Sequence, residues 1–176
     1  MTSALPAHAV LMAQYNAWMN AKLYDAAARL SPEALAADRG AFFGSILGTL
    51  NHQIVSDTIW LKRFAVHPAQ TQVLQVVGEF PAPTALNQLL FTDFAALCER
   101  RQLLDATIQR WAATLTADDL AQTLSYANTK GEAKSKHMGS LVMHLFNHQT
   151  HHRGQATTLL TQAGVDVGET DLLALF

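Results

Sequence analysis

Residues 139–163, GSLVMHLFNHQTHHRGQATTLLTQA, combine an apolar pattern of helical period with a cluster of histidines. Leu141, Leu145 and Leu159 fall on one face when the segment is drawn as an ideal helix. Gly164 follows at a position where helices commonly stop. The sequence therefore predicts a long amphipathic helix over this segment.

The rest of the chain predicts further helices joined by polar or proline-containing segments. The three long ones are expected at Pro6–Leu30, Ser45–Phe64 and Thr84–Leu115, and Ser31-Pro32 begins a short extra helix. A loop is expected from Val66 to Pro83, and a loop or short hairpin at Ala117–His137. These elements predict an all-α protein, an antiparallel four-helix bundle that forms a single domain over residues 1–176.

Composition narrows the classes of protein that fit. The chain has 176 residues, is 49% hydrophobic and 15% charged, and carries a net charge of −2. A net negative charge argues against a nucleic-acid partner bound by bulk electrostatics. A single cysteine excludes an internal disulfide, and no apolar run reaches the ~18 residues that cross a bilayer. We therefore expect a cytoplasmic protein with neither nucleic acid nor membrane as its partner.

Histidine is concentrated in one part of the chain. Five of the eight histidines lie within residues 137–152: His137, His144, His148, His151 and His152. His148 and His152 are four residues apart on the apolar face, which places their Cβ atoms ~6 Å apart. Two imidazoles at that spacing can share one ion bound at ~2.0–2.1 Å. Spacing alone also allows His144 and His148 as the pair.

A third ligand has to come from another helix, and His52 is the best candidate. It lies in the apolar segment 45–64, and Gly48 and Ser56 on the same side allow a second helix to approach closely. A lone histidine on an apolar face is most often a hydrogen-bonded core residue, so that alternative competes for His52. For His148 and His152 together the alternative of a structural core role is weaker. Two neutral imidazoles buried side by side each need polar partners, and one divalent cation supplies a partner for both.

The histidine segment resembles the signature of the DinB family. The resembling residues are His144–Gln155 (HLFNHQTHHRGQ), Tyr15–Asn20 (YNAWMN), Leu50–His52 with Asp57 and Trp60–Arg63 (WLKR), and Gln162–Val165. They occur in the expected order over nearly the whole chain. The resemblance implies a four-helix bundle with a three-histidine metal site on His52, His148 and His152, and a homodimer. It also implies kinship with enzymes that use low-molecular-weight thiols, namely bacillithiol transferases and mycothiol-dependent isomerases.

An open site of three neutral histidines is typical of catalytic metal centres. With zinc or nickel as the divalent metal, it can activate a thiol or water, so we expect a small-molecule substrate such as a thiol and an S-transferase activity. A metal-dependent hydrolase, or a non-catalytic metal-binding protein of the stress response, are the alternatives. His144, His151 and Gln155 are candidates for catalytic support, orienting the ligands or moving a proton, although surface or structural roles compete for them.

Overall fold

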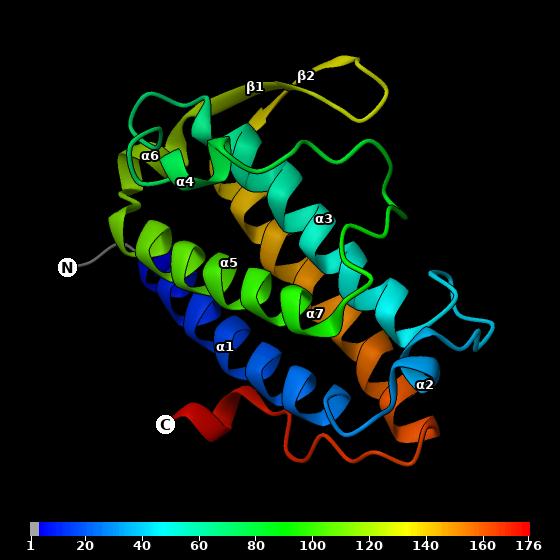
Figure 1. Ribbon diagram of the computed structural model, residues 1–176. Helices are drawn as coiled ribbons and strands as arrows, with labels where there is room; N and C mark the ends of the chain where they lie inside the picture. The colour runs from blue at the N-terminus through cyan, green and yellow to red at the C-terminus, as the bar shows by residue number, and fades with distance from the viewer. Residues whose placement is uncertain (1–3) are drawn as a thin grey trace.

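Four long helices dominate the computed structural model, which describes residues 4–176. They are α1 (Ala4–Ala27), α3 (Ile46–Ala65), α5 (Phe94–Thr114) and α7 (Met138–Gln162). Helix α1 packs against α5 and α7, and α3 packs against the same two helices (Figure 1). The predicted all-α four-helix bundle is confirmed.

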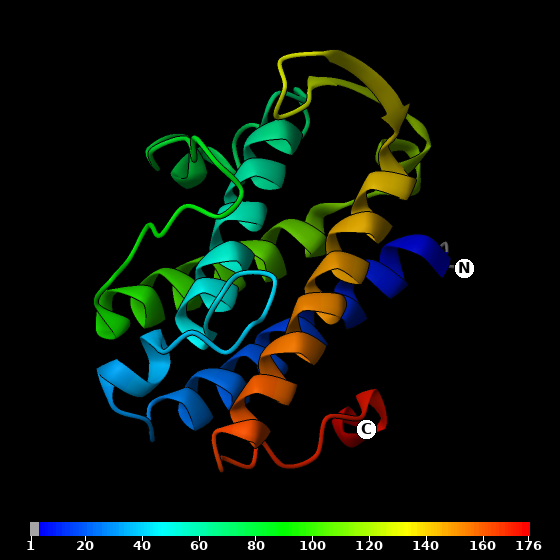
Figure 2. The ribbon, with the colours of Figure 1, turned by 90° about the vertical axis from the view of Figure 1, so that its right-hand side faces the viewer.

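The long connection between α3 and α5 sets the direction of the helices. Residues 66–93, which include the short helix α4 (Gln75–Gly78), carry the chain back along the bundle before α5 begins (Figures 1 and 2). As a result α1 and α7 run one way, and α3 and α5 run the other. Each long helix therefore has one antiparallel and one parallel neighbour, an arrangement that only a long crossover connection permits.

Side-chain caps determine where several helices begin. Ser45 accepts a hydrogen bond from the amide of Gly48 and starts α3, while Asp93 accepts one from Ala96 and starts α5. Ser31 caps the short helix α2 (Pro32–Ala36), which the sequence predicted. The expected helix from Thr84 is wrong over residues 84–93, which form turns, bends and irregular backbone that crosses α3 (Figure 1).

The segment between α5 and α7 forms the predicted hairpin and one further helical turn. The short helix α6 (Ala117–Ala121) begins at a capping box made by Thr116 and Asp119. Strands β1 (Thr123–Ala127) and β2 (Ala133–His137) then pair antiparallel, with Thr123 opposite His137. Beyond α7, a 3₁₀ turn at Leu172–Leu175 (η1) lies near the end of the chain.

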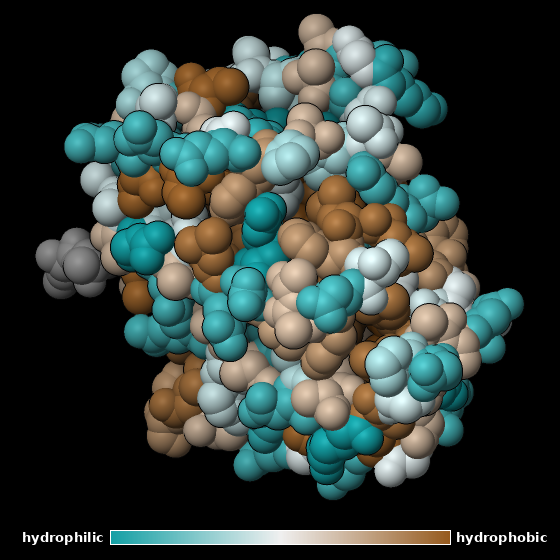
Figure 3. All heavy atoms as spheres, in the orientation of Figure 1, coloured by the Kyte–Doolittle hydropathy of each residue, from teal (hydrophilic) through white to brown (hydrophobic). Residues whose placement is uncertain are grey.

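The apolar core fills the space between the long helices, and the surface is mixed. Figure 3 shows apolar side chains gathered over the segment that crosses α3, which contains the exposed residues Leu86 and Leu89. No helix within residues 4–176 is both long enough and apolar enough to span a bilayer.

A cluster of buried polar side chains lies within this core and joins all four long helices. This buried polar cluster consists of Asn16 and Asn20 of α1, Asp57 of α3, Arg101 and Asp105 of α5, and Gln149 and Arg153 of α7. Arg101 lies between Asp57 at 2.6 Å and Asp105 at 2.9 Å. Gln149 donates a hydrogen bond to Asp57, so the cluster ties α7 to α3.

Candidate metal centre

Three histidines from two helices meet near the middle of the bundle. His52 extends from α3, and His148 and His152 extend from α7 with their ring planes tilted relative to each other. The Nε2 atom of His52 lies 3.3 Å from that of His148 and 3.2 Å from that of His152. The third separation, between His148 and His152, is 3.0 Å. These side chains form a group that could hold a metal ion.

The separations are those of ligands that share one ion. With bonds of ~2.0–2.1 Å, two nitrogens of a tetrahedral zinc site lie ~3.3 Å apart, and adjacent ligands of an octahedral ion lie ~3.0 Å apart. The observed range of 3.0–3.3 Å matches both geometries. The donor set therefore fits a divalent metal, and the neutral imidazole suits zinc and nickel alike.

Hydrogen bonds on the far side of two rings fix their tautomers. The Nδ1 atom of His52 lies 2.7 Å from the carbonyl oxygen of Leu86, and Nδ1 of His152 lies 2.7 Å from Oε1 of Gln155. Both oxygens only accept, so each Nδ1 carries the proton and each Nε2 presents a lone pair. Lone pairs facing one another at this distance repel, and a cation between them removes that repulsion.

His148 is held by a hydroxyl. Its Nδ1 atom lies 3.3 Å from Oγ of Ser56, one turn beyond His52 on α3. A hydroxyl accepts or donates, so this contact allows His148 to present its Nε2 lone pair as well.

Burial keeps all three imidazoles neutral. Desolvation, together with the neighbouring histidines, lowers the pKa of His148 to about 3 and that of His152 to about 4. Desolvation also lowers the pKa of His52, against an opposing effect of its hydrogen bond to Leu86. Neutral imidazole is the form that binds metal, so at neutral pH the site needs no deprotonation before it can bind an ion.

An aromatic ring shields one side of the centre. Phe43 stacks on His52 with ring centroids 3.8 Å apart and meets His152 edge to face at 5.6 Å. Its loop turns back on itself between Ala41 and Gly44 before α3 begins. Phe43 therefore excludes water from this side and leaves the other side as the route of access.

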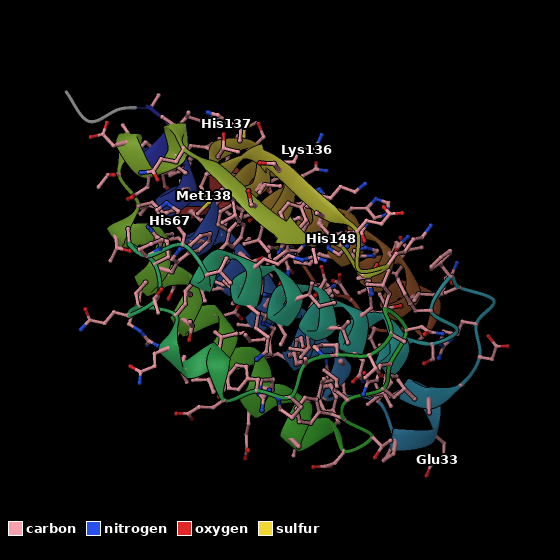
Figure 4. All side chains as sticks on the ribbon, turned by 90° about the horizontal axis from the view of Figure 1, so that it is seen from above. Glu33, His67, Lys136, His137, Met138 and His148 are labelled. Carbon is pink, nitrogen blue, oxygen red and sulfur yellow. The ribbon has the colours of Figure 1, made fainter. Side chains whose placement is uncertain are left out.

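A cavity of about 270 Å³ opens on that other side. Four groups of residues line it: His52, Ser56, Trp60 and Arg63 of α3; Leu86 of the segment that crosses α3; Tyr126, Asn128 and Thr129 of the hairpin; and His144 and His148 of α7. Seen from above, the hairpin extends over α3 and α7 to the position of His148 (Figure 4). The hairpin therefore forms the roof of a chamber beside the candidate metal centre.

The three residues predicted to support catalysis take different positions. Gln155 orients His152, as described above. His144 lines the cavity, with its ring 5.8 Å from that of His148 and 5.0 Å from that of Trp60, and lies outside the three-histidine group. His151 is exposed, and its Nε2 atom lies 3.3 Å from the Gln155 amide nitrogen. His144 thus lies in the wall of the cavity, whereas His151 is linked to the three-histidine group through Gln155.

For several residues of the site, no local sequence pattern indicates that they belong to it. The Leu86 carbonyl belongs to a segment that was expected to be helical, where it would have been used within the helix. Phe43 and Trp60 have the apolar character of ordinary packing residues. The hairpin residues Asn128 and Thr129 reach the cavity only because of the way the strands fold over it.

Comparisons with known proteins agree with this architecture. A family model described as the DinB family matches residues 1–175. Protein DinB of Bacillus subtilis (strain 168) is 26% identical over 160 residues, which cover 90% of this chain and 87% of that protein. The crystal structure of a DinB-like protein from Bacillus cereus ATCC 10987 has a TM-score of 0.56 at 23% identity, covering 89% of this chain and 91% of that one. That likeness shows a shared fold.

Proposed function

The chain belongs to the DinB family, and from that premise we propose that it is a metal-dependent enzyme, a thiol S-transferase, in which three histidines hold zinc or nickel. The ligands are His52, His148 and His152. One observation carries the proposal: their three Nε2 atoms lie within 3.3 Å of one another beside a cavity of about 270 Å³. A divalent ion held there supplies a Lewis acid with room for a further ligand, so that a thiol or water becomes a nucleophile at neutral pH.

The residues around the centre have distinct tasks. Leu86 and Gln155 hold the rings of His52 and His152 in the ligating orientation. Phe43 keeps water from the closed side. The cavity on the open side receives a small-molecule substrate.

His144 is the proton acceptor in this proposal. Desolvation and the charge of Arg63 lower its pKa, so the imidazole is neutral at pH 7 and able to take a proton. Its place on the cavity wall brings it next to the space in which a thiol or water loses that proton.

Metal analysis of gently purified protein tests the site. We expect a roughly stoichiometric divalent metal in the wild type and in His8→Ala, which changes an exposed histidine of α1. His52→Ala and His148→Ala each remove one of three ligands and should lose the metal. Metal retained in both ligand variants contradicts the assignment.

Turnover separates the possible activities. Metal-replete and metal-free protein are given a panel of thiols with electrophilic carbon substrates, and separately a panel of esters and amides. Metal-dependent thioether formation supports the transferase, and metal-dependent hydrolysis with no thioether formation supports a hydrolase instead. No turnover in either panel, with metal bound, leaves a metal-binding protein without catalysis.

The homodimer and the cytoplasmic location are predictions of the same proposal. Sedimentation of the metal-replete protein tests the first, and fractionation of the source cells tests the second.

A further inference from the structure

A cation that forms no ion pair with the described residues lies in the wall of the cavity beside the candidate metal centre. Arg63 is half-buried there, near the end of α3. The cations of the ion pairs within residues 4–176 are Arg101 and Lys134, and no carboxylate of those residues lies within ion-pair distance of Arg63. A partly desolvated guanidinium gains most from a carboxylate or a similar anion, which it binds through two parallel hydrogen bonds.

Two aromatic rings hold this guanidinium in place. Its Cζ atom lies 4.6 Å from the ring centre of Trp60 and 5.0 Å from that of Tyr126. Trp60 and Tyr126 meet edge to face at 5.5 Å, so α3 and the hairpin contact each other beside the cation. Stacking uses the faces of a guanidinium and leaves the N–H groups on its rim free to donate.

The cation and the three histidines occupy the same cavity. One side of α3 carries four residues of the cavity wall, His52, Ser56, Trp60 and Arg63. Their side chains form a line along the helix from the histidines to the guanidinium. On the α7 side, His144 bridges the two ends, with its ring 5.0 Å from Trp60 and 5.8 Å from His148. Asn128 and Thr129 of the hairpin add neutral polar groups to the wall.

We propose that Arg63 binds a carboxylate of the substrate, and that the substrate class is therefore a small thiol that also carries an acidic group. The inference rests on the proposed function for the thiol end and on Arg63, Trp60 and Tyr126 for the acidic end. A ligand anchored at both ends is oriented within the cavity, which positions its sulfur relative to the histidines. A volume of about 270 Å³ is sufficient for a small acid.

Matched thiols test the proposal through binding. Protein loaded with Co²⁺ is titrated with ω-mercaptocarboxylic acids of three to six carbons and with the corresponding amides, and Kd is taken from the change in the cobalt absorption spectrum. In the wild type we expect at least one acid to bind about tenfold more tightly than its amide. In Arg63→Gln the Kd of the acid should rise to that of the amide, and the Kd of the amide should not change.

Arg100→Gln is the matched control. Arg100 is also a half-buried arginine over an aromatic ring, with Cζ 3.8 Å from the ring centre of Phe80, but it does not line this cavity. It should keep the preference for the acid. Acid-to-amide preferences below fivefold at every length, or a preference that persists in Arg63→Gln, overturn the proposal.

A second arm separates this inference from the metal site. If wild-type protein gives no cobalt spectrum, the proposed function fails, and calorimetric titration of the metal-free protein with succinate then tests Arg63 alone. Binding that is lost in Arg63→Gln and kept in Arg100→Gln supports the anion site. No binding to the wild type, or equal binding to both variants, overturns it.

Discussion

The hydrogen bonds of Nδ1 determine how the imidazoles of His52 and His152 are oriented in the candidate metal centre. Leu86 and Gln155 accept hydrogen bonds from Nδ1 of His52 and His152, which directs both Nε2 lone pairs to one point. Without these acceptors, each ring could turn over or exchange its tautomer. The oxygens behind the two rings therefore hold them in the orientation that a shared ion requires.

Metal affinity should stay nearly level from pH 8 to about pH 6 and fall only in more acidic solution, because burial lowers the pKa of all three ligands. The pKa of His148 is about 3 and that of His152 is about 4, mainly because of burial, so protons compete for Nε2 only in acid. Because these pKa values are lowered, the neutral ligating form persists to lower pH than in an ordinary imidazole with a pKa of about 6.5. Competition with a chromophoric chelator at several pH values measures this. An affinity that already falls steeply between about pH 7 and pH 6 would contradict it.

At this scale the sequence predicts the ligands better than their surroundings. His148 and His152 share a helix, so their relation follows from helical geometry alone. The loop contacts of His52 and the exposure of Arg63 depend on how segments far apart in the chain come together, which no local pattern encodes.

Among the elements, the segment of residues 84–92 gives the site a contact that the sequence did not predict, the one between the Leu86 carbonyl and His52. Its apolar residues recur at spacings that also suit a helix, which led to the predicted helix from Thr84. In the structure it lies across α3, held by the side chain of Asn51 through two hydrogen bonds of 2.9 Å to the backbone of Phe91. That anchor holds the segment against α3, where Leu86 reaches His52.

Asn51→Ala should loosen this segment. The Phe91 amide and carbonyl lose their partner in a partly buried place, so we expect the free energy of unfolding to fall by about 1–3 kcal/mol. Amide exchange of residues 84–92 should become faster than in the wild type. Urea unfolding and hydrogen-exchange mass spectrometry measure the two effects.

Asn87→Ala, at an exposed position of the same segment, is the control and should change stability by less than about 0.5 kcal/mol. Unchanged exchange of residues 84–92 in Asn51→Ala would show that the anchor lies elsewhere. The boundaries that caps define, at Ser45 and at Ser31, were in contrast visible in the sequence, because a capping side chain acts within its own turn.

For the molecule as a whole, the buried polar cluster keeps the two histidine-bearing helices together. Asp57 of α3 accepts from Gln149 of α7 and pairs with Arg101 of α5. Burial alone would lower the pKa of Arg101, but Asp105 and Asp57 raise it, so the guanidinium stays charged in the core. The sequence predicted a bundle but not this cluster, because which polar residues face inward depends on the packing of all four helices.

Arg101→Met should destabilise the protein by about 3–5 kcal/mol, because it leaves buried carboxylates without their cation. Lys134→Met breaks the exposed pair with Glu132, whose atoms are 3.0 Å apart, and should cost less than about 1 kcal/mol. Urea unfolding of the metal-free proteins compares the two. Similar losses in both variants would mean that the cluster contributes little to stability.

The order of the ligands along the chain has a consequence for biosynthesis. His52 precedes His148 by 96 residues and His152 by 100. On the ribosome, the first imidazole therefore emerges well before the other two, and a growing polypeptide cannot assemble the full set until its last long helix is made. Truncated products carry only part of the set, so only completed and folded molecules can present all three imidazoles to an ion.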